Sequence, residues 1–211
     1  METPSPSPLP MRLWSLAAIG FASGVLLFLA IRFLVTGIGG TESFNGIPLQ
    51  SPQPATDFTL TGPDNQPVSM SDFRGKVVLL YFGYTFCPDA CPATMSVLKQ
   101  VRQELGRRAE DVQVIMITVD PERDTPEHLA AYMQGFDPTF IGLSGDLDAI
   151  SAAATGYGIF FEKQEGTPAT GYLVDHTASV TAIDRDGYVR LVFPFDMTAV
   201  DIAADIRRLL R

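Results

Sequence analysis

Cysteine, histidine and basic charge are all scarce in this chain of 211 residues, which has two Cys, two His, and 15 Lys and Arg against 24 Asp and Glu. Two cysteines are too few for a small domain held together by several disulfides. The formal net charge of −9 argues against nucleic acid as a partner, because phosphates require clustered Lys and Arg. The 46% hydrophobic and 18% charged residues are typical of a folded protein with one sizeable core.

Charge is absent altogether from residues 13–31, and the apolar character resumes at 33–38 after Arg32. Nineteen helical residues span about 28 Å, which is close to the thickness of a bilayer core. A buried core helix would have a polar face, and this run has none. It is also longer than the apolar part of a cleavable signal peptide, and no convincing cleavage site follows it. We therefore predict a tail at residues 1–12 and one transmembrane anchor at 13–38.

The flanking charges do not fix the orientation of this anchor, because Arg12 and Arg32 lie on either side of it. No Lys or Arg occurs between Arg32 and Arg74, which makes the following segment easy to translocate. Residues 1–8 lack Arg and carry an acid, unlike a mitochondrial transit peptide. The sequence predicts a single-pass protein of the bacterial inner membrane, with its C-terminal domain in the periplasm.

Residues 39–53 are rich in Gly, Ser, Pro and Gln and show no periodic apolar pattern. Such a composition is typical of a flexible linker. We predict that it tethers a domain formed by residues 54–211.

Strand and helix patterns alternate within this predicted domain. Strands are predicted at 58–60, 68–70, 76–83, 112–119, 139–143, 171–183 and 188–193, and helices at 92–105, 126–134, 146–154 and 199–210. A parallel strand–helix–strand unit followed by a β-hairpin and a C-terminal helix is the order of a thioredoxin-like domain. The predicted fold is therefore α/β: a thioredoxin-like domain with an added β-hairpin, preceded by one N-terminal transmembrane helix.

Cys87 and Cys91 form a C-x-x-x-C pair between the predicted strand 76–83 and the predicted helix 92–105. Open α/β sheets place their sites at the carboxyl ends of such strands. A separation of four residues brings both sulfur atoms to one side of a helical turn, where the N–H groups favour thiolates. The same spacing fits the Cα separation of a disulfide. We predict a dithiol that binds a soft metal ion and a redox disulfide between the same two residues.

A third metal ligand must come from one of the two histidines. His128 lies in the first turn of the predicted helix 126–134, where a solvated surface residue is expected. His176 lies at a strand entrance, and by position alone a hydrogen-bonded structural role explains it as well as a ligand role does. Two thiolates and one imidazole suit Cu(I). A structural zinc site needs a fourth ligand, which no further Cys or spare His supplies.

Four segments carry a resemblance to a known family, at residues 82–92 (FGYTFCPDACP), 118–126 (TVDPERDTP), 140–145 (FIGLSG) and 175–180 (DHTASV). They resemble the signature motifs of the SCO/SenC family of cytochrome oxidase assembly proteins, and the resemblance extends over about residues 54–210. It implies a thioredoxin-like domain that binds one copper ion through Cys87, Cys91 and His176. Whether Cu(I), Cu(II) or both are carried stays open.

The resemblance also implies partners. The recipient of the copper is the copper-binding subunit of cytochrome c oxidase, whose cysteines such a protein can also keep reduced. Other periplasmic copper carriers are expected to exchange the ion with it, and the membrane is contacted through the single helix.

Four further residues are candidates to support the ligands. Asp120 follows the predicted strand 112–119 at the same sheet edge, where it could hydrogen-bond near the cysteines, although capping of the next turn explains it better. Asp175 could orient the imidazole of His176, but adjacent residues of a strand point to opposite faces. Tyr84 and Phe86 fit shielding of the site or contact with a partner.

The main functional prediction is a copper metallochaperone without enzymatic activity of its own. The alternative is a thiol-disulfide oxidoreductase that reduces the cysteines of the oxidase copper site. The spacing counts against it, because dithiol oxidoreductases of this fold usually have C-x-x-C. A thiol peroxidase needs a single activated Cys with nearby Thr and Arg, and a sensor needs an output module, so the sequence argues against both.

Overall fold

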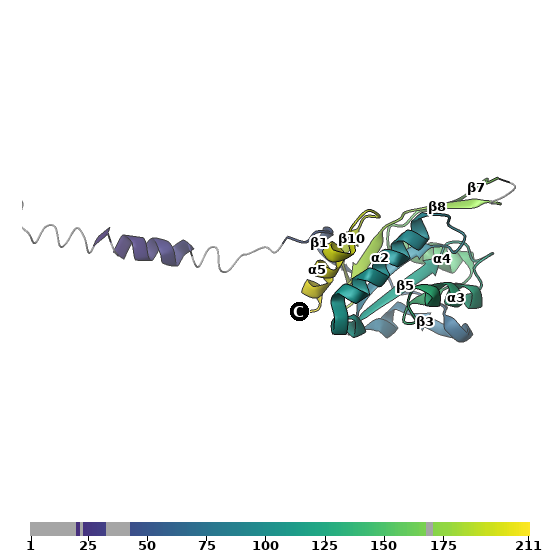
Figure 1. The fold of residues 1–211 in the computed structure, drawn as a ribbon, viewed down its shortest axis with the longest axis horizontal. Coiled ribbons are helices and arrows are strands. Elements are labelled where there is room, and N and C mark those ends of the chain that lie inside the picture. The colour runs from purple at the N-terminus through teal and green to yellow at the C-terminus, as the bar shows by residue number, and fades with distance from the viewer. Residues whose placement is uncertain (1–19, 22, 33–42, 168–170) are drawn as a thin grey trace, which may run out of the picture. The chain divides into compact units, whose positions relative to one another are not determined.

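The computed structural model describes residues 20–21, 23–32, 43–167 and 171–211. The chain forms two compact units, Met1–Ser43 and Phe44–Arg211. In the first unit the described residues 20, 21 and 23–32 are helical (Figure 1). Large apolar side chains of this helix are exposed, namely Phe21, Val25, Leu26, Leu27, Phe28, Leu29 and Ile31.

The predicted transmembrane anchor at 13–38 falls largely outside the described residues, which omit 13–19, 22 and 33–38. Within the part of the chain that is described, no helix combines the length and the apolar character needed to cross a bilayer.

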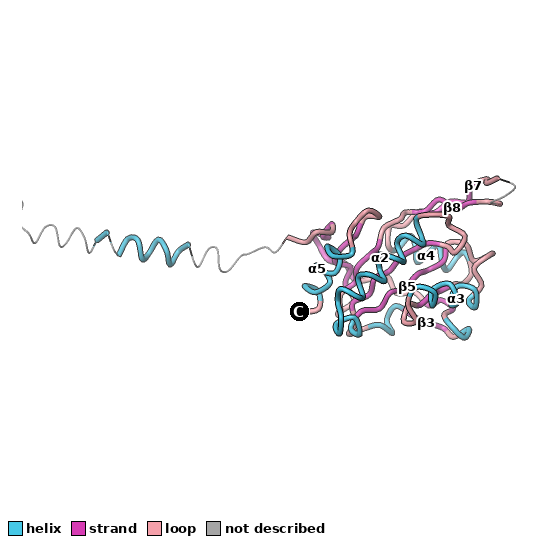
Figure 2. Tube along the Cα trace, in the orientation of Figure 1, coloured by secondary structure: helices cyan, strands magenta, loops and turns pink. Residues whose placement is uncertain are grey.

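The second unit is built on a six-stranded mixed sheet with the order β1-β10-β9-β4-β5-β6 (Figures 1 and 2). These strands are β1 (Ile47–Pro54), β4 (Val77–Gly83), β5 (Val112–Thr118), β6 (Ile141–Leu143), β9 (Val180–Ile183) and β10 (Tyr188–Phe193). β4, β5 and β6 run parallel, and β9 pairs antiparallel with the other edge of β4. Two separate ribbons join β2 (Thr59–Thr61) to β3 (Pro67–Ser69) and β7 (Phe161–Gln164) to β8 (Leu173–His176).

The described residues of this unit also form the α-helices α2 (Ala90–Leu105), α3 (Pro126–Phe136), α4 (Leu147–Gly156) and α5 (Ala199–Leu209). In Figure 1, α2 and α5 lie side by side in front of the sheet, where they pack against each other. The predicted α/β, thioredoxin-like architecture is confirmed. Thr125 and Thr198 cap α3 and α5 as their sequence positions predict, each accepting a hydrogen bond from an N–H group of the first turn.

The central strands fold as their composition predicts. Every residue of β4 and of β5 is buried, because these strands have helices or loops on both faces and a neighbouring strand on each edge. The uninterrupted apolar sequence of β4 ends at Gly83, and Cys87 follows four residues later in the loop that leads to α2.

The prediction of a linker at residues 39–53 is wrong for the second half of that segment. Residues 47–54 form β1, which pairs antiparallel with β10 from Ile47 opposite Val192 to Pro54 opposite Tyr188. β1 is an exposed edge strand with an irregular register, and edge strands tolerate proline and polar residues. Its sequence therefore lacks the apolar pattern that would have revealed it.

The predicted single strand at 171–183 is also wrong, because the structure divides it into β8 and β9. β8 leaves the main sheet and pairs with β7, which the sequence did not predict. The polar sequence of β7 is exposed, as expected for a two-stranded ribbon without a buried face of its own. The predicted turn between β9 and β10 is confirmed, with Gly187 at a positive φ of 79°.

Candidate metal centre

The two cysteines lie at the junction of β4 and α2. α2 begins two residues earlier than predicted, so Cys91 lies within its first turn. Asp89 occupies the N-cap position but its side chain caps nothing. Instead the N–H group of Cys91 lies 3.5 Å from the Cys87 sulfur, to which it donates. Free N–H groups and the dipole at a helix start stabilise negative charge, so this position favours a Cys87 thiolate.

The side chains of Cys87, Cys91 and His176 converge. One ligand atom from each residue lies within 4.8 Å of the other two, and the Cys91 sulfur is 3.4 Å from His176 Nε2. Atoms that bind one ion at about 2.0–2.3 Å lie at most roughly 4.6 Å apart, so the cluster is close to the spacing of a single metal site. No other such group occurs among the described residues. The structure thus brings the three sequence-predicted ligands together.

Aromatic side chains enclose the buried part of this cluster. The Tyr81 hydroxyl donates to the Cys91 sulfur at 3.6 Å, and the N–H group of Tyr84 donates to the same sulfur at 3.5 Å. The rings of Tyr81 and Tyr84 both meet the His176 ring edge-on, each with centroids 5.9 Å apart. A Cβ atom on Gly83 would lie 2.9 Å from the Cys91 sulfur. Only glycine leaves room for the sulfur here.

The two thiols differ in exposure and in acidity. Cys87 is partly exposed, whereas Cys91 is fully buried, and both are free. A hydrogen bond from Cys91 lowers the pKa of Cys87, against the effect of burial, and a hydrogen bond with His176 adds to the lowering. The hydrogen bond to Cys87 and burial raise the pKa of Cys91. Cys87 is therefore the accessible thiolate of the pair, with the buried thiol as its donor.

The Asp175 prediction is not supported by the structure. Asp175 is exposed and lies opposite Glu162 in the β7–β8 ribbon. The Nδ1 atom of His176 instead lies 3.4 Å from the carbonyl oxygen of Thr177. Adjacent residues of β8 point to opposite faces, which separates the carboxylate of Asp175 from the imidazole.

Asp120 has a different role from both alternatives that the sequence offered. Its buried carboxylate forms an ion pair with Arg123 and accepts a hydrogen bond of 2.6 Å from the Tyr172 hydroxyl. The N–H groups of the following turn bond to the backbone carbonyl of Asp120 rather than to its side chain.

His128 is exposed on the first turn of α3 and lies outside the cluster, in agreement with the sequence analysis. Its Nε2 atom is 3.0 Å from the Thr85 hydroxyl, and its ring stacks on Phe86. Tyr84 is buried, and its hydroxyl accepts a hydrogen bond from the N–H group of Val174.

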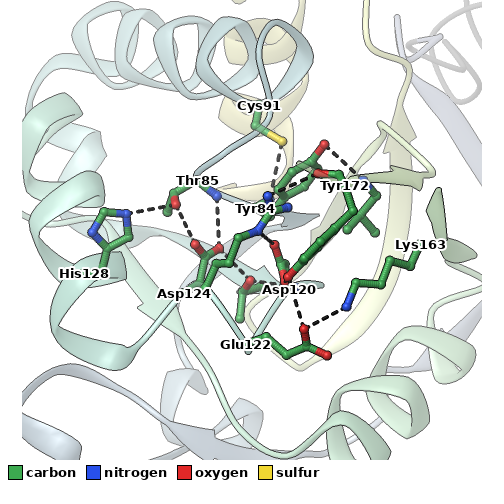
Figure 3. Close-up of polar contacts among 12 residues, drawn as sticks. Tyr84, Thr85, Cys91, Asp120, Glu122, Asp124, His128, Lys163 and Tyr172 are labelled. Carbon is green, nitrogen blue, oxygen red and sulfur yellow. Dashed lines mark hydrogen bonds and ion pairs between the residues drawn. The ribbon is translucent and has the colours of Figure 1, made fainter. Parts of the chain in front are cut away.

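Sequence reasoning missed a polar network that holds the cysteine loop (Figure 3). Asp124 is fully buried and accepts hydrogen bonds from the N–H group and the hydroxyl of Thr85, and from the hydroxyl of Thr118. The network fixes the loop two residues before Cys87. An Asp next to a predicted helix start resembles a surface cap, so the sequence carries no signal for its burial.

The whole folded unit matches one family. The SCO1/SenC family profile aligns with residues 48–211. The chain belongs to the SCO1/SenC family. This agrees with the motif resemblance and extends it over β1, which the motifs do not reach.

Solved SCO1/SenC structures share the fold. Apo Sco1 from Thermus thermophilus is 42% identical, with a TM-score of 0.72, and the match covers 82% of this chain and 100% of that one. Bradyrhizobium japonicum ScoI with copper bound is 38% identical, with a TM-score of 0.68 and coverage of 75% and 100%. Among curated SCO1/SenC proteins, the mitochondrial SCO2 homolog of Mus musculus is 36% identical over 154 residues. That match covers 72% of this chain but only 60% of the mouse protein.

Proposed function

We propose that this SCO1/SenC protein is a membrane-anchored copper metallochaperone that binds one copper ion through Cys87, Cys91 and His176. The observation that carries the proposal is the convergence of the three ligand atoms within 4.8 Å. Two sulfur ligands and one imidazole suit Cu(I). A relative that is 38% identical over the same fold has copper bound, which supports the choice of metal.

The exposure of the ligands is consistent with a cargo that is handed on. Cys87 and His176 line a shallow hollow together with Phe195, whereas Cys91 lies behind them and is fully buried. A partner's ligand can thus approach the ion from the side of Cys87 and His176. The recipient that the family resemblance implies is the copper-binding subunit of cytochrome c oxidase, with other periplasmic copper carriers as donors.

Residues 13–38 are proposed to anchor the domain in the bacterial inner membrane as a single span, with the copper-binding domain in the periplasm. The support is the absence of charge from residues 13–31, together with the exposed apolar side chains of the described helical residues. A lipid environment would cover these side chains.

A copper titration of the full chain tests the ligand assignment. The reduced protein, in detergent micelles, is expected to bind one equivalent of Cu(I) in competition with a chromophoric chelator. Cys87→Ser, Cys91→Ser and His176→Ala should each weaken binding. His128→Ala is the matched control, because it removes the other histidine near the site and should keep the affinity of the unmodified chain. Binding of unchanged strength by His176→Ala would overturn the assignment.

The unequal thiols favour a second candidate, a thiol-disulfide reductase that acts on the cysteines of the oxidase copper site. The Cys87 thiolate would attack one sulfur of the partner's disulfide and release the other sulfur as a thiolate. The Cys91 thiol would then lose its proton, and the resulting thiolate would attack the Cys87 sulfur. This step forms the Cys87–Cys91 disulfide and releases the partner's second thiolate. Two electrons pass to the partner, and an external dithiol must reduce this chain again.

Reduction of a disulfide-bonded peptide separates this candidate from the first. Reductase activity needs both cysteines but not the imidazole, so His176→Ala should retain it while Cys87→Ser and Cys91→Ser lose it. If the His176→Ala variant loses reduction together with copper binding, the independent reductase function is wrong.

A further inference from the structure

The strand that carries His176 is not part of the main sheet. Within the described part of the chain β8 pairs only with β7, and in Figure 1 this ribbon projects from the edge of the domain. The two cysteines, in contrast, follow β4 at the centre of the six-stranded sheet. The distance between the imidazole and the sulfur atoms therefore depends on the short connection from His176 to β9, which pairs with β4, and on the side chains that attach the ribbon to the rest of the domain, among them the Tyr84 hydroxyl that accepts a hydrogen bond from Val174.

Arg123 provides one attachment between the ribbon and the loop after β5. Its guanidinium forms an ion pair with Asp120, and its Nη1 atom donates to the carbonyl oxygen of Tyr172 at 3.1 Å. The guanidinium carbon also lies 3.7 Å from the centre of the Tyr172 ring. Tyr172 immediately precedes β8, so the side chain of Arg123 helps to hold the start of the strand that ends in His176.

Tyr172 completes the attachment from the other side (Figure 3). Its hydroxyl donates to Asp120 at 2.6 Å and lies 3.3 Å from the carboxylate of Glu122. Lys163, on β7, forms an ion pair of 2.7 Å with the same Glu122 carboxylate. Both strands of the ribbon are thus bound to the loop after β5.

The same guanidinium contacts the loop that carries Cys87. Its carbon atom lies 4.8 Å from the centre of the Phe86 ring and 5.7 Å from the centre of the Tyr84 ring. Its Nη2 atom is buried without a hydrogen-bond partner among the described residues, so the aromatic faces are its nearest favourable contacts. Arg123 is 19% exposed and Asp120 3% exposed, so the ion pair is largely removed from water.

We propose that Arg123 is a positioning residue of the metal centre, which acts with Asp120 and Tyr172 to fix His176 relative to the two cysteines. The proposal rests on the proposed copper-binding function. Arginine is required because its planar fork makes the Asp120 and Tyr172 contacts at once while its face stacks on the rings, and lysine cannot do this. Loss of the fork should weaken the contribution of the imidazole and leave the two thiolates in place.

A double-mutant cycle on the full chain tests this coupling. Arg123→Lys is expected to lower the Cu(I) affinity about tenfold, which is typical when a group that orients a metal ligand is changed. In a His176→Ala background the same substitution should change the affinity less than about twofold, because the residue through which Arg123 acts is already absent. An equal loss in both backgrounds would overturn the proposal.

Arg208→Lys is the matched control. Arg208 also pairs with a buried Asp three residues before it, at 3.0 Å from Asp205, and is 26% exposed, but it lies on α5 away from the cluster. The Arg208→Lys substitution should leave the copper affinity unchanged in both backgrounds. Tyr172→Phe is a milder change than Arg123→Lys, since it removes one hydroxyl and keeps the ring. It should lower the affinity by a smaller factor and only when His176 is present.

A measurement without copper provides an independent readout. In the metal-free protein, the edge-on rings of Tyr81 and Tyr84 should give nuclear Overhauser contacts with the His176 ring. Arg123→Lys should weaken these contacts, whereas Arg208→Lys should not. Unchanged contacts together with unchanged affinity would reject the role of Arg123. Failure of the proposed function looks different, because the unmodified chain would then bind no copper or His176→Ala would bind it normally.

Discussion

The acidity of Cys87 leads to a prediction that thiol chemistry can check directly. The hydrogen bond from Cys91 lowers the pKa of Cys87 to about 3, against the effect of burial and with a further contribution from His176. Cys87 should then be a thiolate throughout the neutral range. Its alkylation by iodoacetamide in the reduced, metal-free chain should be independent of pH between about 6.5 and 8.5.

An ordinary thiol behaves quite differently over the same range. With a pKa of about 8.5, its thiolate fraction rises from about 1% at pH 6.5 to about 50% at pH 8.5, so its rate rises about fifty-fold. The absolute rate is a poor test, because the nucleophilicity of a thiolate falls as its pKa falls, with a Brønsted coefficient of about 0.4–0.5. The pH dependence of the rate separates the two cases.

Mass spectrometry of the alkylated protein provides the assay. Cys91→Ala removes the largest cause of the lowered pKa, so the rate at Cys87 should again increase with pH. In Cys87→Ala, Cys91 should react slowly at every pH because burial shields its sulfur from the reagent and also raises its pKa, although the hydrogen bond to Cys87 that raises this pKa most is then absent. A fifty-fold increase at Cys87 in the unmodified chain, parallel to that of a free thiol, would show that the assignment of the thiolate is wrong.

Two further predictions concern the packing of the site and the start of the domain. Gly83→Ala places a Cβ atom 2.9 Å from the Cys91 sulfur, so we expect an overpacking cost of about 1–3 kcal/mol and weaker Cu(I) binding, measured by thermal unfolding and chelator competition. Asp205→Ala removes a fully buried carboxylate that accepts hydrogen bonds from the N–H groups of Asn45 and Gly46, both at 2.8 Å. Unfolding in urea should show a loss of about 3 kcal/mol or more.

Each of these predictions has its own control. Gly135→Ala introduces a Cβ atom with no neighbour within 4 Å, inside α3, and should stabilise the domain slightly without changing copper affinity. Asp205→Asn keeps the shape and one acceptor oxygen, so its cost should be smaller than that of Asp205→Ala. Unchanged copper affinity in Gly83→Ala, or equal stability of the two Asp205 variants, would contradict the respective argument.

The central part of the fold could be predicted from the sequence because its signals are local. The apolar runs that became β4 and β5, the caps of α3 and α5, and the turn before Gly187 each depend on a few consecutive residues. The cysteine pair is also a local signal. A separation of four residues at the start of a helix brings the two sulfur atoms together independently of the rest of the chain.

The remaining elements needed the tertiary structure. β1 and β7 are strands only because an edge and a partner strand accept their backbone hydrogen bonds, and their exposed side chains leave no apolar pattern. The expectation that Asp175 orients the imidazole is likewise not supported, since the oxygen that lies near His176 Nδ1 is the backbone carbonyl of Thr177.

The sequence by itself determined that two thiols would lie together at the end of a buried strand, and its resemblance to SCO/SenC motifs singled out His176. Only the folded chain decided how the imidazole reaches the sulfur atoms, of which that of Cys91 lies 85 residues earlier. That contact depends on β8 leaving the sheet and on the attachment of its ribbon through Arg123, Asp120 and Tyr172. Such contacts join residues far apart in the chain, so no local pattern of side chains encodes them.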